Sequence, residues 1–163
     1  IWLFISSTLF DVHNSPAHGV GFVSPDGSLS IQFSMVGFVD DSTGTCNDFQ
    51  PQHEASLQHL MQQMEHDAQL WSNMLYCTGG KLELPKCSFH VLRFEFQANG
   101  SPVPVIESYD NQIHILDPET STRIQIPSKR AFDPHKTLGH FKSPYANQTM
   151  ELQSICTNAD QIA

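Results

Sequence analysis

The chain has 163 residues, of which 39% are hydrophobic and 15% are charged. This balance suits a globular domain with a hydrophobic core and excludes a disordered chain. Eight Lys and Arg stand against seventeen Asp and Glu, and the net charge of -9 argues against a stand-alone nucleic-acid binder.

The first residues, IWLFISSTLF, begin within an apolar pattern, so we interpret the chain as part of a longer protein. Apolar side chains at helical spacing predict the end of a buried helix over residues 1 to about 15, stopped by Asn14-Ser-Pro16. The run is too short to span a bilayer and lacks the features of a signal peptide. We therefore expect an intracellular protein and leave nucleus or cytoplasm open.

Two β-rich runs, Gly21–Val23 and Ser30–Val39, flank the turn signal Pro25-Asp-Gly27. The second run stops at Asp40 and Asp41, which predicts a hairpin with both acids at its turn and a return strand over Cys46–Phe49. Two neighbouring carboxylates repel each other. The pair is therefore either a solvated turn or a place where a cation binds.

Residues 53–77 predict a long helix, because apolar side chains recur at steps of three or four and give a Met-rich core face. The opposite face is expected to be polar and to contain Gln58, Gln62, Gln63, Glu65 and Asp67. Gly79-Gly80 then ends the helix.

The rest of the chain reads as β-rich. The run Phe89–Phe96 leads to the hairpin signal Asn99-Gly100, and residues 113–116 and 123–127 predict a second hairpin. From Ala131 onward, Pro134, Gly139 and Pro144 are expected to interrupt any regular element. The order of elements predicts an α+β fold, with helices packed on an antiparallel sheet.

The cysteines and histidines give no metal motif. The four cysteines form no CxxC pair, and we expect free thiols. His53, His59 and His66 are six and seven residues apart, so the His-x3-His pair of helical metal sites is absent.

The order of four further motifs resembles the palm domain of reverse transcriptases of the non-LTR retroelement type. Phe38-Val-Asp-Asp41 matches the aromatic-x-Asp-Asp box, motif C, which lies on a hairpin turn in that family. A helix follows, and then Gly80 and Lys86, as in motif D. Leu138-Gly139-His140 is similar to motif E, the primer grip. Residues 1–13 look like the helix after motif B.

The resemblance implies RNA-directed DNA synthesis by two-metal nucleotidyl transfer, with Mg2+ or Mn2+ as cofactor. Asp40 would bind the metal directly, and Asp41 would be the secondary acid of the site. Phe38 would pack beneath the turn and Val39 would face the primer end. Lys86 would lie near the phosphates of the incoming nucleotide. RNA template, DNA primer and dNTP would be the partners.

The resemblance also implies a division of the chain. Residues 1–98 would form part of a palm with a polymerase-like antiparallel sheet. Residues 99–163 would form a β-rich connection in which Leu138 and Gly139 contribute to the primer grip. The 52 residues from Lys86 to Leu138 exceed the usual interval, and we expect an insertion over Gln112–Pro127.

The family also requires an Asp from motif A, which would precede Ile1. Neither Asp11 nor Asp26 replaces it, so we expect the chain to be inactive alone. The basic fingers region would also lie upstream, which would account for the acidity of this part. The alternatives are a decayed or repurposed palm-like module without catalysis, for which fold sets no function, and an unrelated Mg2+-dependent hydrolase.

Overall fold

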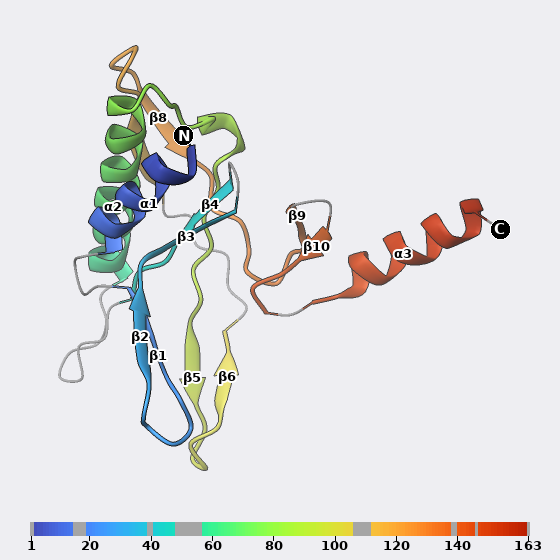
Figure 1. Ribbon diagram of the computed structural model, residues 1–163. Coiled ribbons are helices and arrows are strands. Elements are labelled where there is room, and N and C mark those ends of the chain that lie inside the picture. The colour runs from blue at the N-terminus through green and yellow to red at the C-terminus, as the bar shows by residue number, and fades with distance from the viewer. Residues whose placement is uncertain are drawn as a thin grey trace. The chain divides into compact units, whose positions relative to one another are not determined.

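We describe a computed structural model of the chain (Figure 1), which defines residues 2–14, 19–38, 41–47, 57–105, 112–137, 140–145 and 147–162. It forms two compact units, residues 1–87 with 112–126 and residues 88–111 with 127–163. We call them unit 1 and unit 2. The predicted division at residue 98 lies within unit 2. The α+β class is confirmed, and the described strands pair only in two-stranded antiparallel hairpins.

Unit 1 contains two helices, three hairpins and one 3-10 turn. Its elements are α1 (Trp2–Asn14), β1 (Val20–Val23), β2 (Ser30–Phe33), β3 (Met35–Phe38), β4 (Asp41–Gly44), α2 (Leu57–Cys77), η1 (Leu84–Lys86), β7 (Ile113–Leu116) and β8 (Arg123–Ile126). Unit 2 contains β5 (Phe94–Phe96), β6 (Pro102–Pro104), β9 (His135–Thr137), β10 (His140–Lys142) and α3 (Thr149–Ile162).

The predicted N-terminal helix and first hairpin are confirmed. α1 ends at Asn14, and β1 pairs with β2 across a turn in which Gly27 adopts a φ of 71°. The predicted single strand Ser30–Val39 divides at Ser34 into β2 and β3. The cause is Asn14, whose Oδ1 accepts the N–H groups of Ser34 and Met35 at 2.8 Å each.

The return strand of the second hairpin begins earlier than predicted. β4 starts at Asp41 and pairs with β3, whereas the described part of Cys46–Phe49, residues 46 and 47, is not a strand. The small side chains that follow Asp41 form β4 rather than a turn. The prediction of a strand at Cys46 was therefore wrong.

The long helix is confirmed over its described part, and α1 and α2 lie side by side (Figure 1). Trp71 and Leu75 of α2 join Leu9 and Met35 in a buried cluster. Asp67 is only 9% exposed, so its assignment to the polar face was wrong. The helix ends in a Schellman motif, in which Gly79 has a φ of 82° and the Gly80 N–H donates to the Leu75 carbonyl.

The β7–β8 hairpin packs on α2 through polar side chains as well as apolar ones. The N–H groups of His114 and Leu116 donate to Glu65 Oε2 and Gln69 Oε1, at 2.8 and 2.7 Å. Gln69 Nε2 also donates to the Leu116 carbonyl at 3.0 Å. Side chains of α2 thus satisfy the free edge of β7, which would otherwise need another strand.

Unit 2 agrees with the sequence in its first half and departs from it in the second. β5 and β6 pair across Asn99-Gly100, where Gly100 has a φ of 81°. The β9–β10 hairpin and α3 contradict the expectation that Pro134 and Pro144 prevent regular structure. Each proline lies between elements, where no backbone N–H is needed. None of the described helices is both long and apolar enough to cross a membrane.

Candidate functional site

Asp41, one acid of the predicted metal pair, is the first residue of β4 and is exposed. Its partner in the register is Phe38, the last residue of β3. Val39 and Asp40, which join these two residues in the sequence, lie outside the described residues. The carboxylate of Asp41 is therefore at the open end of a two-stranded hairpin, where a hard oxygen ligand is accessible to solvent.

The hairpin that carries Asp41 is fixed to both helices of unit 1. Trp71 is 4% exposed, and its Nε1 donates to Ser42 Oγ at 3.1 Å. The Phe10 ring packs on Trp71 with centroids 5.0 Å apart. A Cβ at Gly37 would lie 2.3 Å from Phe10 Cζ, so only glycine lets β3 approach α1 this closely. The residue after Asp41 is thus held by the core.

A buried polar network supports the same hairpin at its other end. His13 and Ser34 are each 1% exposed, and His13 Nδ1 lies 3.1 Å from Ser34 Oγ. The Ser34 hydroxyl also donates to the His13 carbonyl at 3.0 Å, and His13 packs edge-on against Trp71. Sequence analysis missed this network, because only its position in the fold distinguishes a buried histidine from a surface one.

Lys86, the predicted phosphate-binding lysine, lies at the end of η1 and is exposed. No hydrogen bond or ion pair joins it to Asp41 in the part of the chain that the structure describes. Leu138 and Gly139, the predicted primer-grip residues, lie outside the described residues. The roles of all three stay predictions.

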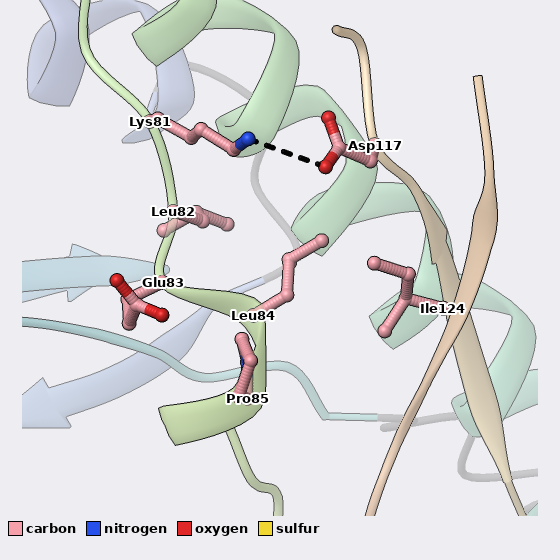
Figure 2. A pocket seen from close by; sticks show the side chains of 7 residues that line it. All are labelled: Lys81, Leu82, Glu83, Leu84, Pro85, Asp117 and Ile124. Carbon is pink, nitrogen blue, oxygen red and sulfur yellow. Dashed lines mark ion pairs between the residues drawn. The ribbon is translucent and has the colours of Figure 1, made fainter. Parts of the chain in front are cut away.

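A half-open pocket of about 390 Å³ lies between the segment that leads into η1 and the β7–β8 hairpin (Figure 2). Its lining includes Lys81, Leu84, Asp117 and Ile124, and the side chains of Leu84 and Ile124 point toward the same space. Lys81 Nζ lies 2.6 Å from Glu119 Oε2 and 3.4 Å from Asp117 Oδ2.

The charges at this pocket are engaged in the protein's own structure. The hydrogen bond to Glu119 raises the pKa of Lys81 above its ordinary value. Asp117 Oδ1 accepts the N–H of Glu119 at 2.9 Å, and this bond lowers the pKa of Asp117. Asp117 therefore closes the β7–β8 turn, and Lys81 anchors that turn to the segment after α2. The predicted hairpin turn at Asp117 was correct, but its pairing with Lys81 has no signal in the sequence.

The cysteines are all free thiols, as predicted. Burial, together with the negative charge of Asp67, raises the pKa of Cys46 to about 11. A thiol with this pKa is protonated near neutral pH and is neither a nucleophile nor a metal ligand. Within the described ranges, no three His, Cys, Asp or Glu side chains lie close enough together to hold a metal ion.

Two features of unit 1 therefore deserve the name of candidate sites: the hairpin end that carries Asp41 and the pocket beside Lys81. The first has an exposed carboxylate on a fixed strand, and the second has charged groups that already bind one another. The hairpin end is the better candidate for chemistry with a cation. Comparison with known proteins found no family model, no curated protein and no solved structure that matches this chain.

Proposed function

We propose that the chain is part of a retroelement reverse transcriptase, which synthesises DNA on an RNA template from a DNA primer and dNTP. The observation that carries the proposal is the β3–β4 hairpin, which presents Asp41 directly after its turn and is anchored by Trp71. This supports the aromatic-x-Asp-Asp motif as a metal-binding turn. The order of Gly80, Lys86 and Leu138-Gly139 further along the chain adds to it.

The exposed carboxylate of Asp41 fits a hard divalent ion, because Mg2+ and Mn2+ prefer oxygen ligands. In the proposed site Asp40 and Asp41 would hold the metal, and Lys86 would neutralise phosphate charge. The bound ion would polarise the reacting phosphate and stabilise the charge that develops there. A palm-like sheet and a third acid would need segments that the described residues do not supply, and we expect no polymerisation by this chain alone.

Calorimetry with MgCl2 and MnCl2 tests the proposal. We expect the parental chain to bind the ions weakly and the Asp40→Asn/Asp41→Asn variant to lose this binding. The matched control is Asp11→Asn/Asp160→Asn, which removes the same charge from exposed positions on α1 and α3. The control should bind as the parental chain does.

Binding that survives in the Asp40→Asn/Asp41→Asn variant would contradict the proposal, as would binding that both variants lose equally. Either outcome would favour the alternative, a decayed or repurposed palm-like module in which the two acids form a solvated turn.

A further inference from the structure

Three lysines of unit 2 have no acidic partner. Lys129, Lys136 and Lys142 are exposed, and they form no ion pair among the described residues. Arg130 differs from them, because its guanidinium makes two bonds to Asp133, at 2.7 and 3.0 Å. The segment 127–142 therefore presents free ammonium groups in a chain whose net charge is -9.

Two of these lysines lie beside a pair of imidazoles. The rings of His90 and His135 pack with centroids 4.7 Å apart. Lys142 is the register partner of His135 in the β9–β10 hairpin, so the two side chains share one face of it. Lys129 lies next to His90, because its carbonyl is 3.1 Å from His90 Nδ1 and its N–H donates to the Phe89 carbonyl. We call these four residues the cationic cluster.

The cluster lacks a charge that would balance it. The positive charge of Lys129 lowers the pKa of both imidazoles, in addition to the effect of their burial, and each imidazole charge would oppose the other. Asp133, the acid in this segment, is occupied by Arg130. An anion at this face would therefore meet two free ammonium groups and two imidazoles that it would help to protonate.

We propose that the cationic cluster binds phosphate groups of a single-stranded nucleic acid. Lysines are point charges suited to phosphate contacts that do not read sequence. Exposed aromatic groups lie in the same segment: Phe132 is 43% exposed, and Phe141 lies on the opposite hairpin face with Lys136 Nζ 5.9 Å from its ring. Lysines interleaved with aromatic rings are typical of surfaces that bind single strands. The choice of nucleic acid rests on the proposed function.

The experiment measures fluorescence anisotropy of a labelled oligothymidylate of about 20 nucleotides with the whole chain. Two phosphate contacts on a single strand predict that the Kd rises about sevenfold between 50 and 200 mM salt. We expect Lys129→Gln/Lys142→Gln to weaken binding on the order of tenfold and to flatten this salt dependence.

The matched control is Gln58→Glu/Gln62→Glu, which lowers the net charge equally at exposed positions of α2 in unit 1. It should keep the parental Kd, and circular dichroism checks that both variants fold. Equal weakening by the two variants, or no binding by the parental chain, would overturn the inference. Binding of the parental chain to phosphatidylserine vesicles but not to the oligonucleotide would also overturn it and would assign the lysines to a membrane surface.

The failure of this inference can be distinguished from that of the proposed function. Loss of metal binding in the Asp40→Asn/Asp41→Asn variant depends on unit 1, whereas oligonucleotide binding depends on the cationic cluster in unit 2. If the metal binds and the oligonucleotide does not, the proposed function stands and the cluster has no role in binding the template or primer.

Discussion

Unit 1 contains eleven of the seventeen acidic residues, whereas unit 2 contains five of the eight basic ones. The basic residues of unit 2 are Arg93, Lys129, Arg130, Lys136 and Lys142, and its acidic residues are Glu95, Glu107, Asp110, Asp133, Glu151 and Asp160. The net charge of the whole chain therefore conceals a strongly acidic unit and a nearly neutral one. A composition that argues against nucleic-acid binding by the chain does not exclude it for unit 2.

The two units also differ in what holds them together. Unit 1 has a buried cluster around Trp71, to which α1, β3 and α2 all contribute. Unit 2 buries fewer large side chains, among them Phe89 and Val91, and contains the stacked histidines. The comparison predicts that loss of packed volume affects unit 1 most, and that a change of charge affects unit 2.

The largest expected effect is on unit 1. Trp71→Ala removes a ring that is 4% exposed and should lower the free energy of unfolding by about 3–5 kcal/mol in urea titrations. Trp71→Phe retains most of the packing but loses the bond to Ser42 Oγ, and should cost about 1 kcal/mol beyond the lost volume. Hydrogen exchange at Phe89 and Val91 in unit 2 should be unchanged. Equal loss of protection in both units would show that they unfold together.

A smaller effect is expected where β3 approaches α1. Gly37→Ala places a Cβ 2.3 Å from Phe10 Cζ and should destabilise the chain by about 1–3 kcal/mol. The control is Gly21→Ala in β1, where an added Cβ has no neighbour within 4 Å. Thermal unfolding compares the two variants. A Gly37→Ala variant as stable as Gly21→Ala would mean that the hairpin is not held against α1.

The smallest effect is expected from acid on unit 2. Burial, followed by the charges of His135 and Lys129, lowers the pKa of His90 below 6.5, and burial and Lys129 do the same for His135. The unfolded chain then binds more protons, so this stabilisation is complete above pH 6.5 and declines as the pH falls through that value. Protonation would also affect His135 Nδ1, which is buried without a hydrogen-bond partner in the described structure.

Urea titrations from about pH 7.5 to about pH 5 measure this decline, and His135→Gln should reduce it. The window lies above the range in which carboxylates such as Asp26, with a pKa of about 2, change charge. Imidazole pKa values above 6.5 in NMR titrations would contradict the prediction and would mean that the histidine pair does not distinguish unit 2.

Much of the fold could be predicted because local signals determine it. Helical spacing defined α2, and Gly79-Gly80 and Asn99-Gly100 occupy the positive φ angles that glycine adopts most easily. The division of Ser30–Val39 could not be predicted, because it depends on Asn14, some twenty residues earlier in the chain. α3 was missed because Pro144 was taken to prevent a helix rather than to precede one.

The candidate site was predictable only in part. The aromatic-x-Asp-Asp motif located the hairpin, but the support of Ser42 by Trp71 depends on how α2 packs. The burial of His13, the pairing of Lys81 with Glu119 and the contact of His90 with His135 join residues far apart in sequence. No local pattern encodes such contacts.

The division of unit 1 along the chain has a consequence for its synthesis. The Glu65 and Gln69 side chains of α2 wait for β7, and that hairpin is complete only at Ile126. At ribosomal rates of about 5–20 residues per second, α2 would remain uncovered on this side for roughly 2–10 s after Cys77 is made. Residues 88–111 leave the ribosome during that interval. A nascent chain stalled before Ile126 would therefore expose one side of α2 to chaperones and to aggregation.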